Sequence, residues 1–386
     1  MLESHPTLRV QDIAPFKTQG RWSPSRTAFV HYTYNARGAI YQLLQSLPAN
    51  QGNTVLLPAF HCFAAVEPVL RAGYRPLFYR IREDLSVDLA DLCSKLSCDI
   101  AAVIVIQYCG FQASIDDILP LRKQYGFYVV EDWAHSFLKN EGGTLTGDKG
   151  DMAVFSFYKL TPCYVGGGLR INVPELSFLE SNKQLSVKKS IIAIKRLVEQ
   201  LIDNSHNGIL KWAFHHVEKR RVALRRGSRP SVAGVDAQIP DSYLFHDELA
   251  RVGMPWFARA ILHTSDVRTL VSVRRRNFEI LNDNLEENDR ITKVLKKLPE
   301  NVCPWAYPVL VKDRSQYDQV LRSRGVPVFT FGELLHPAVY NSGSTVIESA
   351  EFLSKRLMMI PLHQNLDSGQ MTSICENVNA LFARAG

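Results

Sequence analysis

The chain has 386 residues, of which 46% are apolar, and a formal net charge of +7. At about 100–200 residues per domain this length suggests two or three domains, whose cores need no disulfide or metal. The seven cysteines show neither an even-numbered disulfide pattern nor the Cys and His spacing of a zinc site, so no metal is expected. The N-terminus lacks the features of a signal peptide, and no stretch reaches the ~18 apolar residues of a membrane span. We therefore expect a cytoplasmic protein with reduced thiols.

From residue 35 onward, short apolar runs typical of strands alternate with segments typical of helices. Helices are expected at 35–47, 63–73, 88–96 and 115–126. Continuous apolar runs predict buried strands at 54–58, 75–81, 101–107, 127–132, 152–157 and 168–172. Buried strands separated by helices indicate an α/β fold with a mostly parallel sheet covered on both faces. Ligands bind such sheets at the carboxyl ends of the strands, so the polar residues that follow strands are the candidates for a site.

After residue 175 the chain departs from this alternation. An amphipathic helix is expected at 186–202 and a second, basic helix at 209–226. Later segments predict helices at 262–287, 315–325 and 368–384 and strands at 308–313 and 327–329, which indicate a smaller α+β domain. The expected division is an N-terminal segment 1–30, a large domain 31–255 that includes the basic helical segment 175–229, and a small domain 256–386.

A carboxylate and a lysine at successive strand ends form the strongest local combination in the sequence. Asp132 ends the strand in VVED, and Lys159 follows the strand in FSFYK. Pyridoxal phosphate needs both groups, because its aldehyde forms a Schiff base with a lysine and its ring nitrogen needs a carboxylate partner. Each residue also has an ordinary interpretation, since aspartates at strand ends often cap helices and lysines after strands are usually solvated. The spacing alone leaves both interpretations open.

The start of the first predicted helix, at Ala36, Arg37 and Gly38, is a candidate phosphate site. Backbone N–H groups at a helix start bind anions, and the helix dipole favours negative charge there. An arginine side chain could add a bidentate contact. The alternative is an ordinary N-terminal turn.

Five motifs occur in a fixed order along the chain. They are LLPAFHCFAAVEPVLRAGYRPLFY, YCGFQASIDDI, VVEDWAHSF, TGDKGDMAVFSF, and a lysine followed after six residues by GGG, with IPLHQNLD near the C-terminus. With these motifs the chain resembles the DegT/DnrJ/EryC1/StrS sugar aminotransferases, firmly over residues 30–175 and loosely over 300–386. AFHC and the short FSFYK segment suggest a divergent branch. The resemblance implies an aspartate-aminotransferase-like fold (fold type I), pyridoxal 5'-phosphate as cofactor, and a homodimer.

The resemblance also implies a role for each matching position. Lys159 would form the Schiff base and transfer protons, Asp132 would pair with the pyridine nitrogen, and His135 would contact the ring hydroxyl. Ser156 would reach the cofactor phosphate. Arg37 takes the place of a threonine in the family's phosphate turn.

Two departures from the family pattern concern the cofactor site. The family places an aromatic residue over the cofactor ring, where this chain has Cys62, and the neighbouring His61 is the other candidate for that place. The Gly-x-Asn-x-Arg segment with which a partner subunit reaches the phosphate is not evident at 230–260. Either Arg225, Arg226 or Arg229 substitutes for it, or the phosphate site is closed differently.

By this resemblance the chain is a ping-pong aminotransferase that moves an amino group from glutamate or glutamine to a keto-sugar. The acceptor would be nucleotide-linked, and the product would serve polysaccharide or glycosylated-metabolite biosynthesis. Lys159 argues against the dehydratase branch of the family, which has histidine at that position. Two alternatives stay open: an aminotransferase for a lipid- or carrier-bound acceptor, and a cofactor-binding protein that has lost transamination and acts as a regulatory or interaction module through its basic helices.

The net charge is concentrated in one segment. Residues 183–229 contain twelve Lys or Arg and three acidic residues, which gives +9 and leaves −2 for the rest of the chain. Nucleic-acid binding is not expected, because this segment has few aromatic residues and no nucleic-acid motif. One interpretation is a solvated helix face. The other is a surface for an anion: a nucleotide diphosphate, an anionic lipid headgroup or an acidic carrier protein.

Overall fold

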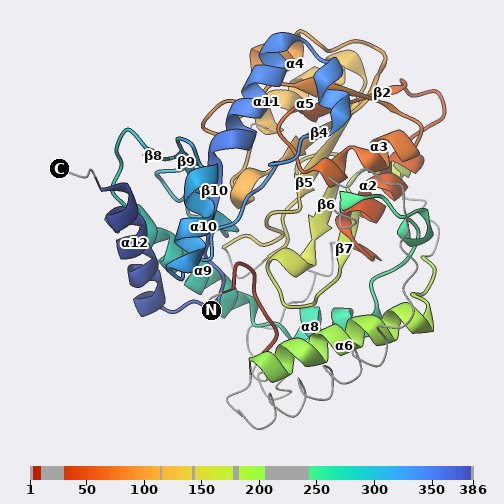
Figure 1. Cartoon of the computed structure of the whole chain (residues 1–386). Helices are drawn as coiled ribbons and strands as arrows, with labels where there is room; N and C mark the ends of the chain where they lie inside the picture. Colours follow the sequence, from red (N-terminus) through yellow and green to blue (C-terminus); the bar gives the residue numbers. More distant parts are fainter. Residues whose placement is uncertain are drawn as a thin grey trace, which may run out of the picture.

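The computed structural model describes residues 3–9, 30–113, 115–140, 144–176, 182–204 and 243–383. Two sheets organise this part of the chain, a large one of seven strands and a small one of three strands (Figure 1). The second basic helix expected at 209–226 and most of the N-terminal segment 1–30 lie outside the described residues.

The large sheet has the strand order β1-β7-β6-β5-β4-β2-β3. Its strands are β1 (His31–Thr33), β2 (Thr54–Pro58), β3 (Arg75–Tyr79), β4 (Ile100–Ile106), β5 (Tyr128–Trp133), β6 (Met152–Ser156) and β7 (Gly167–Ile171). Strands β2, β3, β4, β5 and β6 run parallel to one another, whereas β7 is antiparallel to β6 and β1 is antiparallel to β7. The mostly parallel sheet expected from the apolar runs is therefore confirmed.

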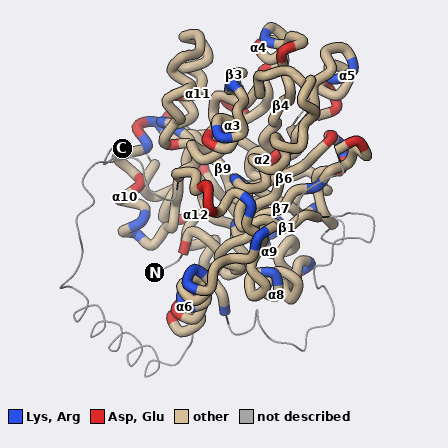
Figure 2. Tube along the Cα trace, turned by 90° about the vertical axis from the view of Figure 1, so that its right-hand side faces the viewer, with Lys and Arg blue, Asp and Glu red and all other residues tan. Residues whose placement is uncertain are grey.

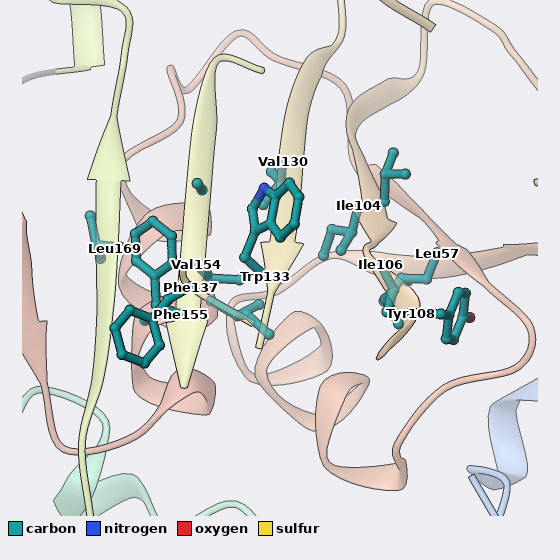
Figure 3. Close-up of a cluster of buried hydrophobic side chains, with 14 of the residues drawn as sticks. Leu57, Ile104, Ile106, Tyr108, Val130, Trp133, Phe137, Val154, Phe155 and Leu169 are labelled. Atoms are coloured by element: carbon teal, nitrogen blue, oxygen red, sulfur yellow. The ribbon is translucent and has the colours of Figure 1, made fainter. Parts of the chain in front are cut away.

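Helices cover this sheet, and apolar side chains fill the space between the layers. The helices of this part of the chain are α2 (Ala36–Gln45), α3 (Glu67–Arg71), α4 (Leu89–Cys93) and α5 (Ile115–Tyr125), with α6 (Val187–Asp203) lying near α8 (Trp256–Thr264) (Figure 1). Figure 3 shows side chains of neighbouring strands packed into one cluster, among them Ile104, Val130 and Leu169. All residues of β2 and β4 are buried, because both faces of a central parallel strand are covered.

The small sheet has the antiparallel order β10-β9-β8. Its strands are β8 (Ile291–Lys293), β9 (Ala306–Val311) and β10 (Leu357–Pro361), and the helices of this half of the chain are α8 (Trp256–Thr264), α9 (Val267–Asn284), α10 (Ser315–Ser323), α11 (Ser344–Arg356) and α12 (Ser368–Phe382). A second core made by residues between Phe278 and Phe382 packs this sheet against its helices. The expected domain limits stay predictions.

The structure corrects three predictions in the C-terminal half. The helix predicted at 262–287 is two helices, because Ser265 has an extended backbone and Asp266 caps α9 by accepting a hydrogen bond from the N–H of Thr269 at 3.1 Å. The strand predicted at 327–329 is a single bridge between Phe329 and Met359. Helix α11 and the strands β8 and β10 were not predicted. None of the helices within the described ranges is both long and apolar enough to cross a membrane.

Helix α6 carries the described part of the basic segment. Five of the twelve basic residues lie at 183–204, together with two of the three acids, so most of the excess charge belongs to residues 205–229 outside the described ranges. Figure 2 shows Lys and Arg along α6. Some of these charges are paired: Lys189 Nζ lies 3.0 Å from Glu248 Oε1, and Arg196 Nη1 lies 2.9 Å from an oxygen of Glu199.

Candidate active site

A cavity of about 410 Å³ opens at the carboxyl ends of β4, β5 and β6. Its walls combine strand ends, the start of α2, the turn after β2, and residues of the C-terminal half. The large sheet contributes Asp132, His135, Ser156 and Lys159 to these walls, as expected for a ligand site at the carboxyl edge of a parallel sheet. Seven of the nine residues singled out for the site line this cavity, and Gly38 and His61 do not. The seven are Ala36, Arg37, Cys62, Asp132, His135, Ser156 and Lys159.

Lys159 follows β6 in a single 3-10 turn, Phe157–Lys159, whose Phe157 side chain is anchored in the core. Its Nζ lies 4.7 Å from the ring centre of Trp305 and 5.8 Å from that of Phe331. Burial among these side chains lowers the pKa of Lys159, although Cys62 and Asp132 act in the opposite direction. The amine therefore loses its proton more readily than an ordinary lysine, as a lysine that attacks an aldehyde must.

Asp132 lies near the end of β5 and is only 5% exposed. One carboxylate oxygen, Oδ1, accepts a hydrogen bond from the N–H of Ala134 at 2.8 Å. Burial raises the pKa of this carboxyl group, while the Ala134 N–H and the charge of Lys159 act to lower it. A buried carboxylate of this kind is stabilised by a cation placed beside it.

His135 is buried and neutral. Its Nδ1 accepts a hydrogen bond from the N–H of Cys109 at 3.1 Å, so the ring proton belongs on Nε2. The ring stacks on Trp305 with centres 4.2 Å apart and meets Phe331 edge-on at 4.4 Å. Burial, together with the charge of Lys159, lowers the pKa of His135 well below its usual value. The side chain is thereby fixed as a neutral hydrogen-bond donor.

The start of α2 forms another part of the wall. Asn35 caps this helix by accepting a hydrogen bond from the N–H of Gly38 at 2.9 Å, so Gly38 is engaged and does not line the cavity. Arg37 does line it, and its guanidinium donates to the carbonyl of Leu244 at 2.5 Å. Gly167 of β7 packs directly on this turn, since a Cβ there would lie 2.3 Å from the carbonyl carbon of Asn35. This close approach explains one glycine of the GGG motif.

Pyridoxal 5'-phosphate fits this set of residues. Lys159 offers an amine with a lowered pKa, and no Lys, Arg or His side chain in the described residues hydrogen-bonds to Asp132, which suits a cationic ring nitrogen. The first turn of α2 and Ser156 offer N–H and hydroxyl donors on the same cavity for a phosphate.

Of the two candidates for the position over the ring, Cys62 lines the cavity and His61 does not. His61 is fully buried, with Nδ1 2.9 Å from the carbonyl oxygen of Pro58 and its ring stacked on Phe78. The substitutes considered for the missing partner segment, Arg225, Arg226 and Arg229, lie outside the described residues.

The sequence did not predict the part of the cavity wall that is formed by residues from distant segments of the chain. Trp305, Phe329 and Phe331 form its aromatic part, and His5, Tyr158, Tyr243 and Arg322 also line the cavity. Tyr158 had a signal, because it directly precedes Lys159 in the sequence. The others are far from every motif, and no local pattern marks them.

The chain is similar to known proteins in sequence and in fold. Residues 25–175 match the sequence model of the DegT/DnrJ/EryC1/StrS aminotransferase family. The chain is 27% identical to GDP-perosamine synthase of Vibrio cholerae over 158 residues, which is 41% of each protein and thus less than two thirds of the relative. It is 21% identical to dTDP-4-dehydro-2,3,6-trideoxy-D-glucose 4-aminotransferase of Saccharopolyspora spinosa over 369 residues, which cover 92% of this chain and 83% of that protein.

The fold also has solved counterparts. Helicobacter pylori PseC, an aminotransferase involved in the biosynthesis of pseudoaminic acid, superposes with a TM-score of 0.67 over 99% of this chain and 98% of that one. At 16% identity this likeness shows the shared fold. The expected fold, a large mostly parallel sheet with a smaller C-terminal α+β part, is confirmed.

Proposed function

Because residues 25–175 match the sequence model of the DegT/DnrJ/EryC1/StrS aminotransferase family, we propose that the chain is a member of this family and transfers an amino group to a keto-sugar with pyridoxal 5'-phosphate as cofactor. The observation that carries the proposal is the meeting of Lys159 and Asp132, from successive strands of the sheet, in one cavity. Two relatives are named for GDP- and dTDP-linked sugars, which supports a nucleotide-linked keto-sugar as the acceptor.

Three groups of the cavity would each have a separate role in such a reaction. When bound, the cofactor supplies an aldehyde and an electron-accepting ring, which stabilises negative charge at the carbon that exchanges the amine. With the cofactor bound, Asp132 would hold the proton on the ring nitrogen, and the Nε2–H of His135 would be available to donate to the ring hydroxyl. Lys159 would take a proton from the substrate carbon and return it, and its lowered pKa would favour this transfer.

Glutamate or glutamine is the proposed amino donor. Because the same Lys159 serves donor and acceptor in turn, the two substrates would react in a ping-pong order. The resemblance further supports a homodimer and a role in polysaccharide or glycosylated-metabolite biosynthesis, and the cytoplasm remains the expected compartment. A lipid- or carrier-bound acceptor stays the alternative.

A cofactor-binding protein without transamination is less well supported by this site. Such a protein needs no amine with a lowered pKa at the carboxyl end of β6, yet the surroundings of Lys159 lower its pKa. Regulation through the basic helices would depend mainly on residues outside the described ranges.

Spectroscopy of the purified, cofactor-loaded protein tests the proposal. We expect a visible absorption band that changes when glutamate is added. In Lys159→Ala this band should be absent, and turnover should be lower by about 10²–10⁴-fold. Lys149→Ala is the control, because Lys149 is exposed, does not line the cavity and pairs with Asp116 of α5. A band that responds to no amino donor would contradict transamination, and the absence of any band would contradict the cofactor.

A further inference from the structure

The described N-terminal residues, 3–9, form a strap across two parts of the molecule. The strap lies against the segment after β10, where His363 Nε2 donates to the carbonyl of Glu3 at 2.8 Å and Asn365 Nδ2 donates to that of Thr7 at 2.9 Å. It then reaches α6, where Asn204 Nδ2 donates to the carbonyl of Leu8 at 3.0 Å (Figure 1). The Leu8 side chain is 1% exposed. These contacts fix the backbone of the strap on both sides of His5.

The strap places His5 in the wall of the active-site cavity. The imidazole lines the cavity together with Lys159. Its ring centre lies 5.1 Å from that of Phe329, which in turn lies 5.2 Å from Trp305, the ring beneath the Lys159 amine. His5 therefore continues the aromatic wall away from the reacting lysine; it is a lining residue of the cavity, and part of it is exposed.

The surroundings of His5 suit a neutral ligand group. Although part of the His5 side chain is exposed, the loss of hydration against the wall, with the charges of Lys159 and Arg274, lowers its pKa to about 4. Near pH 7 the imidazole is thus uncharged, with one nitrogen that donates and one that accepts hydrogen bonds. Ser4 Oγ lies 2.8 Å from Nδ1 and orients the ring. A hydroxyl group, which also donates and accepts hydrogen bonds, is a suitable partner for this ring in either tautomer.

We propose that His5 is a substrate-contacting residue that hydrogen-bonds a hydroxyl group of the sugar acceptor against the wall formed by Trp305 and Phe329. Apolar walls with a few placed polar groups are how small-molecule sites fix orientation. An amino-acid donor such as glutamate has no sugar hydroxyl group for this contact, so we expect His5 to affect the acceptor more than the donor. The inference rests on the proposed function, because it takes a sugar to be the acceptor.

Calorimetry on the cofactor-loaded protein tests this with three non-reactive nucleotide sugars, dTDP-glucose, GDP-mannose and UDP-N-acetylglucosamine. For the tightest of them we expect His5→Ala to raise Kd by about 3- to 30-fold, as for the loss of one hydrogen bond in a binding site. His5→Gln, which keeps a donor and an acceptor, should stay within about threefold of the wild type. Thr7→Ala, on the same strap but outside the cavity, should bind like the wild type. The glutamate-induced change of the visible band should keep its rate in all three variants.

The outcomes separate this inference from the function on which it rests. Binding of the sugar with equal Kd by wild type and His5→Ala would overturn the role of His5 and leave the proposed function intact. Equal losses in sugar affinity and in the response to glutamate would also overturn it, because a misplaced strap would then be the cause. If the wild type responds to glutamate but binds none of the three sugars, the nucleotide-sugar acceptor fails, and the role of His5 falls with it.

Discussion

Lys159 and Asp132 both sit where burial disfavours their charged forms. Burial lowers the pKa of the lysine and raises that of the aspartate, and the two charges only partly offset these effects for each other. The cofactor-free protein therefore holds groups that are suited to a ligand rather than to stability. Strain of this kind at a binding site is released when a ligand of matching charge enters.

Asp132→Asn should separate the role of this carboxylate in the reaction from its effect on the stability of the fold. Asparagine keeps an oxygen for the Ala134 N–H but cannot hold a proton on the ring nitrogen, so turnover should fall by about 10²-fold or more. Because the folded pKa of Asp132 lies above its ordinary 3.8, its ionisation costs stability as pH rises through that raised value. In chemical denaturation without cofactor, the variant should match the wild type below pH 3.8 and be more stable at pH 7.

Asp148→Asn is the control with the opposite sign. Although burial tends to raise the pKa of Asp148, its hydrogen bond to Lys139 at 2.8 Å leaves that pKa below the ordinary value. Its ionisation therefore stabilises the fold above pH 3.8, and the variant should lose up to about 1 kcal/mol at pH 7. A more stable Asp148→Asn, or a less stable Asp132→Asn at pH 7, would contradict this account of the site.

The predicted and the missed residues of the cavity differ in a physical way. Asp132, Ser156 and Lys159 follow strands whose apolar runs are visible in the sequence, and the register of a parallel sheet brings successive strand ends together. Trp305 and His5 reach the same cavity only through the packing of the small sheet and of the strap. Such packing is a tertiary property, and no periodicity in the sequence encodes it.

At the scale of elements, apolar runs located the central strands almost residue for residue. Strand β2 was predicted with its observed bounds, and β4 is shifted by one residue. Prediction failed where a single short polar side chain determines a helix boundary. Asp266 is an example, because its side chain caps the start of α9 within a segment that was predicted as one helix. Prediction also failed for β10, whose run LMMIP follows α11 without a turn signal.

The contact between β7 and the start of α2 is an element-scale feature that can be tested by Gly167→Ala. The new Cβ would meet backbone atoms of Asn35 and Ala36, which cannot rotate away as a side chain would. We expect a loss of about 1–3 kcal/mol in the free energy of unfolding and weaker cofactor binding, since the first turn of α2 must shift. Denaturation and titration with pyridoxal phosphate measure the two effects.

Gly369→Ala provides the comparison for this experiment. Gly369 lies in the first turn of α12, and a Cβ there would make only an ordinary contact of 3.5 Å with Asp367. Alanine favours the helix by up to about 1 kcal/mol, so this variant should be as stable as the wild type or more so. Equal behaviour of the two variants would show that β7 and α2 tolerate separation.

For the molecule as a whole, the net charge divides into a body near neutrality and one basic segment. The described part of that segment, α6, pairs several of its charges with acids and also exposes Val187 and Ile191, at 76% and 61%. The remaining seven basic residues, within 205–229, have one acid among them. If the basic segment has an anionic partner, the residues at 205–229 supply most of the electrostatic attraction to that partner.

Charge reversal of Arg220, Arg221, Arg225 and Arg226 to glutamate tests for that partner. Clustered cations bind anions with an affinity that falls as salt rises, so the variant should raise KM for a nucleotide-linked acceptor, or lower partitioning onto anionic vesicles, by about tenfold or more at low ionic strength. The matched control reverses four exposed, scattered cations, Arg268, Lys297, Lys312 and Arg324, and changes the net charge by the same amount. Unchanged KM and unchanged partitioning in the first variant would leave a solvated helix face as the explanation, whereas equal effects in both would assign the attraction to net charge alone.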